Sequence, residues 1–238
     1  MHNLDYCFVP AAENHLIELL PRKDRARLVA VCEPVHLVPG TVLCEPGSTT
    51  REVYFPVQGH VSLIADAEGK PGVEVSMVGR EGMLGVQLAL GVTTSPLRAL
   101  VQGAGESWRL SASAFRTELA NSNALHRILQ RYVFVLMAQL ASSATCLRFH
   151  QISPRLARWL LMSHDRAQTD SFQLTQEFLA YMLGVRRVGV TVAAGALQRK
   201  GLIEYRRGQL SVLDRKGLEA AACSCYASDC QTYVEQLG

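Results

Sequence analysis

The sequence predicts an α+β protein in which a long helix joins two domains. Short apolar runs separated by turn residues between positions 35 and 110 indicate antiparallel strands. The stretch from 113 to about 150 has neither glycine nor proline and indicates helix, and helical periodicity followed by two short apolar runs fills 174–213. We therefore expect units at 1–112, 113–150 and 151–238, in a chain of 238 residues that is long enough for two cores.

The first unit is predicted to be a small β-roll, preceded by one or two amphipathic helices over 13–31. Pairs of turn-forming residues recur along it, as at Pro39-Gly40 and Pro46-Gly47. Between these turns the apolar residues mix alternation with continuous runs. This is the pattern of strands that surround a closed interior.

Residues 113–150 are predicted to form one long helix that pairs with its copy in a homodimer. Apolar or small side chains recur along it at alternating spacings of three and four. Roughly thirty helical residues extend about 45 Å, farther than one small domain covers. The alternative is a core helix buried within a single chain. The predicted dimer face consists of Leu125, Ile128, Tyr132, Val135, Gln139 and Ser142.

Pro154 marks the predicted domain boundary, near 149–153, and a new helix is expected from Arg155. Further on, Thr175 is suited to cap a helix. Ala180 and Gly184, four residues apart, supply the small contact and the positive-φ turn of a helix-turn-helix. The apolar spacing then leaves the polar residues after the turn on the outer face, whereas the alternative is an ordinary helical hairpin.

Two short apolar runs, over 202–205 and 210–213, flank a polar turn after the second helix and predict a winged helix-turn-helix. Arg206 and Arg207 in this turn are placed to contact phosphates, and a solvated turn is the alternative. The region 186–215 has seven Arg or Lys and two acidic residues, whereas the whole chain has a net charge of only +3. This concentration of charge favours duplex DNA as the partner.

Several functional classes find no support in the sequence. There is no run of about eighteen uncharged apolar residues and no basic segment followed by an apolar one at the start, so we expect neither a membrane span nor a signal peptide, and a cytoplasmic protein. No nucleophile elbow, P-loop or zinc-protease motif occurs, so we expect no enzyme. Seven cysteines, an odd number, favour reduced thiols over a disulfide framework.

The order of roll, long helix and winged helix-turn-helix resembles the cyclic-AMP receptor protein and FNR (CRP/FNR) family of bacterial transcription regulators. The segments RLARWLL, LTQEFLAYMLGVRR and LQRKGLIEYRRG are similar to the DNA-binding domain of that family, and VYFPVQGHVSLI and GREGMLG to its cyclic-nucleotide-binding-like roll. The resemblance implies a homodimeric regulator that binds a pseudo-palindromic operator and contacts RNA polymerase. A rival hypothesis is an effector- or redox-sensing module with weak or vestigial DNA binding.

The resemblance also implies which residues contact DNA. Arg187 occupies the position of the arginine that binds guanine in the major groove. Val188 and Val192 stand where cyclic-AMP receptors have a glutamate and a second arginine, so a different operator sequence is expected, with contacts to thymine methyl groups. The other predicted DNA-contacting residues are Thr175, Gln176, Arg186, Thr191, Arg199, Arg206 and Arg207.

The roll departs from cyclic-nucleotide-binding relatives at the residues that would hold the ligand. Met83 replaces the glutamate of the family's Gly-Glu-Leu-Gly turn, and a methionine does not take the hydrogen bonds of a ribose hydroxyl. Ser95-Pro96 replaces the phosphate-binding Arg-Ser pair. A buried phosphate without its guanidinium is poorly stabilised, so we expect a ligand other than cyclic AMP, or none. The predicted effector pocket consists of Gly82, Met83, Leu84, Gly85 and Arg98.

No cofactor is predicted. FNR-type members hold an iron–sulfur cluster on closely spaced N-terminal cysteines, whereas the cysteines at positions 7, 32 and 44 are widely separated. Cys223, Cys225 and Cys230 form a dense group, but structural zinc sites usually have four ligands and no fourth is evident beside them, so no metal site is predicted. Metal binding or oxidant sensing by these thiols stays open. Haem ligation also stays open for His2, His36, His60 and His126.

Overall fold

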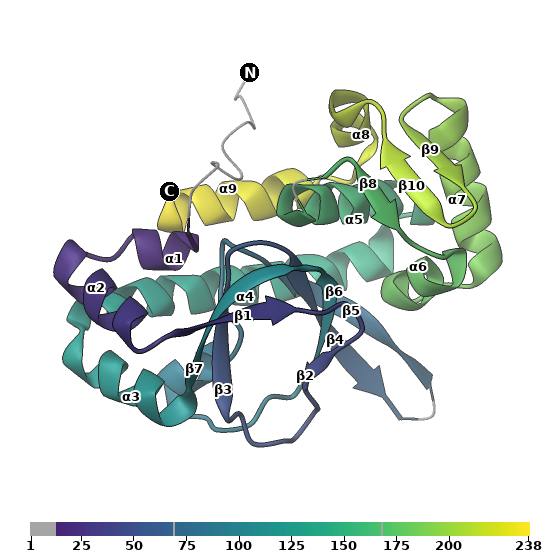
Figure 1. The fold of residues 1–238 in the computed structure, drawn as a ribbon. Coiled ribbons are helices and arrows are strands. Elements are labelled where there is room, and N and C mark those ends of the chain that lie inside the picture. The colour runs from purple at the N-terminus through teal and green to yellow at the C-terminus, as the bar shows by residue number, and fades with distance from the viewer. Residues whose placement is uncertain (1–12, 69, 168) are drawn as a thin grey trace.

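The computed structural model describes residues 13–68, 70–167 and 169–238. Two domains lie on either side of one long helix, α4, which crosses the molecule between the roll and a layer formed by α5 and α9 (Figure 1). The winged domain occupies one end of the molecule, with α6 against the roll. This architecture confirms the predicted α+β class and the order of its parts.

Two short helices, α1 (His15–Glu18) and α2 (Arg22–Ala30), precede the roll as predicted. Asn14 caps α1 by accepting a hydrogen bond from the amide of Leu16. Its side-chain nitrogen also donates to the carbonyl oxygens of Pro56, at 2.9 Å, and Gly82, at 2.7 Å. One buried amide therefore ties the N-terminal helices to the roll.

The roll consists of two antiparallel sheets. The first has the strand order β1-β7-β3, with β1 at Glu33–Leu37, β7 at Gly105–Ser111 and β3 at Glu52–Pro56. The second has the order β2-β6-β4-β5, with β2 at Val42–Cys44, β6 at Arg98–Gly103, β4 at His60–Ala67 and β5 at Lys70–Val78. A short 3₁₀ helix, η2 (Val86–Leu90), closes one side. The apolar side chains that alternate along these strands thus enclose an interior, as predicted.

The stretch predicted as one helix is divided into α3 (Ala112–Asn121) and α4 (Asn123–Phe149). Ser122 separates them, and its hydroxyl accepts the amide of Leu125 at 3.1 Å to cap α4. A serine hydroxyl competes with the helical backbone for hydrogen bonds, so it starts a second helix without glycine or proline. The prediction of a single helix over 113–150 is therefore wrong at this point.

The predicted dimer face of α4 packs inside the same chain. Leu125, Tyr132 and Val135 are buried in the core that α4 shares with the roll. Gln139 is also buried and accepts a hydrogen bond from Ser76 on β5 at 3.0 Å, while Ile128 and Ser142 are partly buried. The periodicity of the four buried residues therefore reflects packing on the roll, and a place in a dimer seam stays a prediction for Ile128 and Ser142.

The opposite side of α4 carries exposed apolar side chains. Phe134 is 53% exposed and Met137 is 63% exposed, and Leu140 lies one turn further on. We expected no apolar segment long enough for a membrane span. By the test of length and composition, however, α4 could cross a membrane, and so could the bent pair of α6 and α7 if it is counted as one span. Core helices of soluble proteins meet the same test, and α4 packs on β5, η2 and α9.

The C-terminal domain begins with α5 (Ile152–Ala167), so the boundary falls at 150–151 and Pro154 lies in the first turn of the new helix. A three-stranded sheet of order β8-β10-β9 backs the helices, and its strand β8 was not predicted. The remaining elements are β8 (Ser171–Gln173), α6 (Gln176–Leu183), α7 (Arg187–Arg199), β9 (Ile203–Arg206), β10 (Gln209–Val212), α8 (Arg215–Ala221) and α9 (Cys225–Leu237).

A buried ion pair and a hydrogen bond join the two domains, and a second buried ion pair lies within the C-terminal one. Arg166 near the end of α5 pairs with Glu81 of the roll at 2.7 Å, and both side chains are at most 5% exposed. Arg158 on the same helix pairs with Asp229 of α9, also at 2.7 Å. The backbone carbonyl of Glu81 accepts a hydrogen bond from Tyr233 at 2.9 Å. The DNA-binding domain is therefore held against the roll by charges shielded from water.

Candidate nucleic-acid interface

The helices α6 and α7 form the predicted helix-turn-helix. They meet at an angle of 106°, and Gly184 ends α6 with a φ of +62°, the left-handed conformation that glycine adopts at low cost. Thr175 caps α6 by accepting the amide of Phe178 at 3.0 Å. The cap and the turn glycine thus stand where the sequence predicted them.

One face of α7 is packed and the other faces solvent. Val190, Ala193 and Leu197 are buried in the core of the domain. Val188 is 73% exposed and Val192 is 65% exposed, which is unusual for large apolar side chains on a short helix. The polar residues Arg186, Arg187, Thr191 and Arg199 are also exposed.

Hydrogen bonds hold the base of this surface in place. Thr191 donates from its hydroxyl to the side-chain oxygen of Gln176 at 2.7 Å, which joins α7 to α6. The amide of Tyr205 donates to the side-chain oxygen of Gln198 at 3.2 Å, which joins α7 to the wing. Thr191 and Gln176, both predicted DNA contacts, therefore also fix the orientation of the helices that carry the arginines.

The wing is a tight hairpin of β9 and β10. Arg206 pairs with Gln209, so Arg207 and Gly208 alone form the turn, with φ values of +50° and +82°. Two consecutive positive φ angles define the type I′ turn that matches the twist of two-residue hairpins. Arg207 is the one non-glycine residue with a positive φ in the described part of the chain. The turn therefore projects Arg206 and Arg207, both exposed, from the surface.

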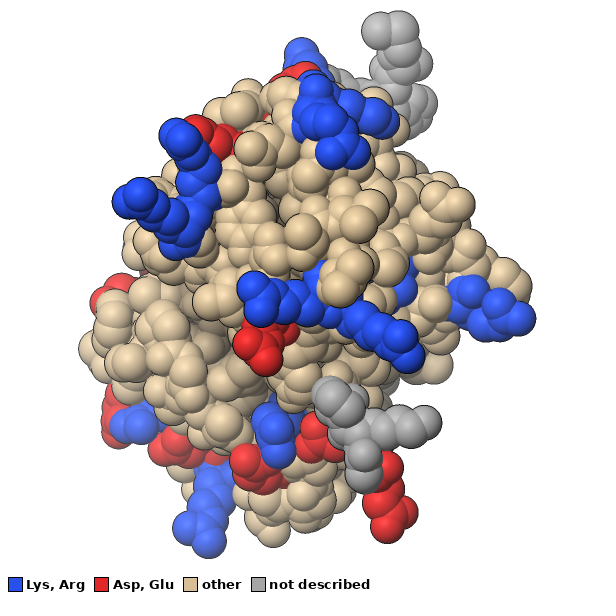
Figure 2. Space-filling view, turned by 90° about the vertical axis from the view of Figure 1, so that its right-hand side faces the viewer, with Lys and Arg blue, Asp and Glu red and all other residues tan. Residues whose placement is uncertain are grey.

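The charge distribution on this end of the molecule matches an anionic partner. Figure 2 shows basic side chains dominating the upper half of this face, with most of the acidic ones in the lower half. Arg206 is 81% exposed in its side chain, and its ion pair with Glu204 is long, at 3.8 Å. A weakly paired and well exposed guanidinium is available for a phosphate.

The roll contains a separate cavity of about 360 Å³. Its walls include Ser48, Thr49, Arg51, Glu52 and Gln87. Leu84 and Gly85 line it as predicted, and the φ of +94° at Gly85 favours a glycine there. Sequence reasoning missed the polar segment before β3, although its run of hydroxyl and charged residues beside the apolar strand was a usable signal.

The other three predicted effector residues do not line this cavity. Met83 is 1% exposed and lies in the core beneath α4. Gly82 lies against the ring of Tyr132, which leaves no room for a side chain. Arg98 pairs with Glu45 at 2.9 Å and with Asp66 at 3.4 Å. The structure therefore gives no support to these three as effector ligands, since Arg98 is held by carboxylates and Met83 packs in the core.

Two ionisable side chains of the roll are buried. Burial lowers the pKa of His60 to about 3, and neither of its ring nitrogens has a hydrogen-bond partner within the described residues. Burial raises the pKa of Glu74 on β5 to about 7, although Ser62 donates a hydrogen bond to this carboxyl. His60 lies inside the roll, whereas His36 is exposed beside Glu106 and His2 lies outside the described residues. This arrangement adds no support to the haem hypothesis.

The three C-terminal cysteines are not brought together as a set. Cys223 and Cys225 lie beside Cys146 and His150, at the end of α4, and these four offer ligand atoms within 4.8 Å of one another. Cys230 is disulfide-bonded instead and lies outside this group. The expectation that no fourth ligand stands near the thiols is therefore wrong, whereas five of the cysteines in the described residues are free thiols.

Two family models match the sequence over the regions that form these sites. The cyclic nucleotide-binding domain matches residues 34–122, and the Crp-like helix-turn-helix domain matches residues 154–221. A search among curated proteins found no match to the sequence.

Solved structures of similar fold cover most of the chain. A protein from Eubacterium rectale, described as a transcriptional regulator of the crp/fnr family, is 16% identical with a TM-score of 0.68, and the match covers 88% of this chain and 99% of that one. FixK2 from Bradyrhizobium japonicum is 15% identical with a TM-score of 0.68, over 81% of this chain and 98% of its own. The global regulator CLP from Xanthomonas campestris, described as c-di-GMP responsive, is 17% identical with a TM-score of 0.62, over 81% and 99%.

Proposed function

The chain belongs to the CRP/FNR family of transcription regulators and has its helix-turn-helix DNA-binding domain, and from this premise we propose that it binds a pseudo-palindromic operator as a homodimer without cyclic AMP. The observation that carries the proposal is the exposed face of α7, where arginines stand beside two exposed valines. This function places the protein in the cytoplasm, with duplex DNA and RNA polymerase as partners.

The exposed face of α7 is suited to the major groove. Arg187, at the first turn of the helix, provides a bidentate donor for guanine. Val188 and Val192 follow on the same side and offer apolar contact to thymine methyl groups. The surrounding basic and polar residues supply contacts to phosphates, which set affinity but not sequence. These contacts are assigned to Thr175, Gln176, Arg186, Arg199, Arg206 and Arg207.

The exposed side of α4 is the proposed dimer face. Phe134, Met137 and Leu140 form an apolar stripe on the side turned away from the roll. Pairing of two such stripes removes these side chains from water and places the two winged domains on the same side of the dimer. The two α7 helices would then enter successive major grooves about 34 Å apart.

The roll cavity is the proposed effector site, and cyclic AMP is disfavoured because two residues at the family's ligand positions point elsewhere. The side chain of Met83 is turned into the core and Arg98 is held by two carboxylates, so neither is available for a ribose or a phosphate. The hydroxyl and charged groups around the cavity fit a small polar molecule. We infer that a ligand there acts by moving the roll against α5, where Glu81 and Arg166 join the domains.

DNA binding is tested by fluorescence anisotropy of the reduced protein on duplexes selected from a random pool, with no effector and with salt varied. The proposal expects sequence-selective binding that excess cyclic AMP leaves unchanged within twofold. Binding that depends only on salt would contradict it and favour a sensing module with vestigial DNA contacts. Selective binding that requires cyclic AMP would contradict the effector assignment alone.

The dimer face is tested by sedimentation equilibrium of a Phe134→Glu, Met137→Glu double variant. Charges buried at an interface without partners are costly, so the variant should be a monomer at concentrations where the wild type is a dimer. Arg116→Glu on α3, an exposed site away from α4's apolar stripe, is the matched control. A double variant that remains dimeric would contradict this choice of face.

A further inference from the structure

Four side chains converge where α4 ends and α9 begins. Cys146 lies in the last turn of α4 and His150 is the C-cap residue four positions later, a spacing that places both on one side of the helix end. Cys223 and Cys225 come from the segment that leads into α9. The two pairs are more than seventy residues apart in sequence and belong to elements packed along each other.

Two distances within this group match the edges of a coordination sphere. The sulfur atoms of Cys146 and Cys223 are 3.5 Å apart, and the sulfur of Cys225 is 3.5 Å from Nδ1 of His150. A tetrahedral zinc ion with bonds of about 2.3 Å to sulfur and about 2.0 Å to nitrogen has sulfur–sulfur edges of about 3.8 Å and sulfur–nitrogen edges of about 3.5 Å. A disulfide requires about 2.0 Å between sulfurs, so Cys146 and Cys223 are not bonded to each other.

The group is enclosed by protein. Cys146, Cys223 and Cys225 are buried and form a small cluster of their own, and His150 is partly buried at its edge. Four protein ligands complete a tetrahedron and leave no position open for water. This is the arrangement of a structural metal site, because catalytic zinc sites keep one position open.

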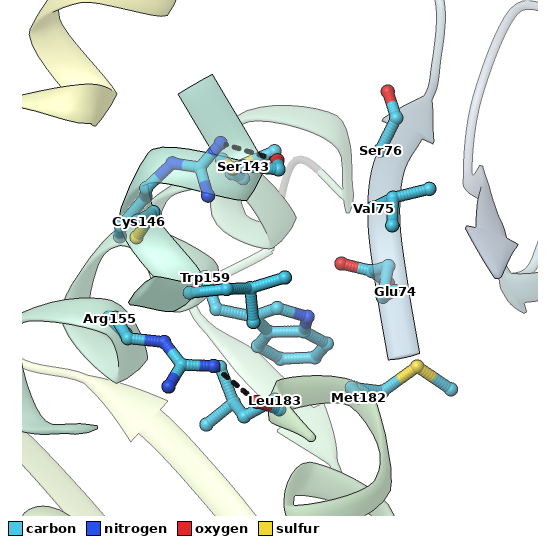
Figure 3. Close-up of a pocket in the computed structure, with 12 residues that line it drawn as sticks. Glu74, Val75, Ser76, Ser143, Cys146, Arg155, Trp159, Met182 and Leu183 are labelled. Carbon is cyan, nitrogen blue, oxygen red and sulfur yellow. Dashed lines mark hydrogen bonds between the residues drawn. The ribbon is translucent and has the colours of Figure 1, made fainter. Parts of the chain in front are cut away.

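The charges around the group suit bound thiolates. Figure 3 shows Cys146 on the same side of a small cavity as Arg155, with Ser143 nearby. Arg158 also lines that cavity and donates to Ser143 at 3.3 Å and to Asp229 at 2.7 Å. Three thiolates around a divalent cation leave one net negative charge, which guanidinium groups nearby stabilise.

We propose that Cys146, His150, Cys223 and Cys225 bind one zinc ion that fastens α9 to the end of α4. Ligand atoms this close together fit a single ion, whereas an iron–sulfur cluster distributes its ligands over two or more iron atoms and spreads them farther apart. The site stands next to the junction at 150–151, from which α5 leads into the DNA-binding domain. Bound zinc therefore fixes the segment that connects the roll to the DNA-binding helices.

Metal content of the full-length protein tests the site. Protein purified in reducing buffer without chelator should contain about one zinc per chain by mass spectrometry of the elements. Cobalt(II) exchanged into it should give the intense visible bands of tetrahedral coordination with sulfur-to-metal charge transfer. A protein with less than a tenth of an equivalent of zinc that takes up no cobalt would overturn the proposal, as would iron with acid-labile sulfide, or a mapped disulfide between Cys146 and Cys223.

Variants separate the ligands from the other cysteines. Cys225→Ser should lose at least tenfold in zinc affinity, measured by competition with a chelating dye, whereas Cys44→Ser, a roll cysteine outside the group, should keep the wild-type value. Cys225→His keeps a zinc-binding set and should retain the metal if Cys225→Ser fails to fold. Equal zinc affinity in Cys225→Ser and wild type would overturn the assignment. Metal content is independent of DNA binding, so a zinc protein that binds no operator would contradict the proposed function and leave this site intact.

Discussion

The arginines of the C-terminal domain fall into two groups with opposite surroundings. On the DNA-facing side, Arg186, Arg187 and Arg206 are exposed, and the one ion pair of Arg206 is long. Toward the roll, Arg158 and Arg166 are buried, and each pairs with a carboxylate at 2.7 Å. An arginine without a close carboxylate is therefore available to bind DNA, whereas an arginine with a close carboxylate stabilises the fold.

The difference has an energetic basis. An exposed guanidinium keeps its hydration and adds little to stability, so its removal leaves the fold intact. A buried guanidinium has lost its hydration and depends on its partner, so removal of either member leaves a charge uncompensated in the interior. Substitutions in the two groups should therefore affect different measurements.

The largest effect is expected at the buried pair of Arg166 and Glu81. Arg166→Met leaves the carboxylate of Glu81 without its main cation and should lower the free energy of unfolding by about 3–5 kcal/mol in urea titrations. Arg186→Met on the DNA-facing side should change it by less than about 0.5 kcal/mol. A similar loss of unfolding free energy in both variants would contradict the distinction between buried and exposed arginines.

His60 extends the comparison between buried and exposed ionisable groups, because it is buried without a hydrogen-bond partner in the described part of the chain. Burial lowers its folded-state pKa to about 3 from 6.5, so the unfolded chain binds more protons between these values. The contribution of neutral, buried His60 to the free energy of unfolding is therefore complete above pH 6.5 and is lost as the pH falls toward 3. Urea titrations of His60→Leu across this range should show a weaker pH dependence than wild type, by a few kcal/mol in total.

The control for this pH series is His36→Gln, since His36 is exposed on β1. It should keep most of the acid sensitivity of the wild type. If His60→Leu retains the wild-type slope between pH 6.5 and 3, the buried imidazole is not its source.

Arg187 should affect DNA affinity and leave the fold unchanged. Arg187→Ala removes a bidentate guanine donor and should weaken binding to the selected operator by about 1–3 kcal/mol, with an unchanged thermal midpoint. Arg116→Ala, an exposed arginine on α3, is the control for a general loss of charge. An equal loss on operator and random duplex would show that Arg187 contacts phosphate and not a base.

The smallest effect is expected at the wing. Arg207→Asn keeps a residue that tolerates the φ of +50° and removes one exposed charge. It should weaken binding to all duplexes alike and reduce the slope of log affinity against log salt by about 1. A change in sequence preference would instead place the wing against base edges.

The helix-turn-helix could be predicted from sequence because its determinants are local. Thr175 caps α6, Gly184 supplies the left-handed turn, and the Arg207-Gly208 turn closes the wing, each within a few residues of the element that it shapes. Side-chain periodicity then separates the buried from the exposed face of α7. The main arginines that the sequence predicts to contact DNA therefore lie at exposed positions.

The long helix shows where sequence reasoning fails. Apolar side chains stand on both sides of α4, so periodicity alone does not tell which side faces the roll and which faces solvent. The more regular stripe, which includes Tyr132 and Val135, proved to be the buried one. The exposed apolar side chains around Phe134 and Met137 were therefore not predicted.

By itself the sequence determined the α+β class, the order of the units and the DNA-binding motif, because these depend on propensity, capping and short-range periodicity. Only the tertiary structure decided which face of α4 is buried, that Arg98 is held by carboxylates away from the roll cavity, and that Cys146 and His150 meet Cys223 and Cys225. The physical reason is that burial, ion pairing and metal coordination join residues distant in sequence, and their proximity is fixed by packing.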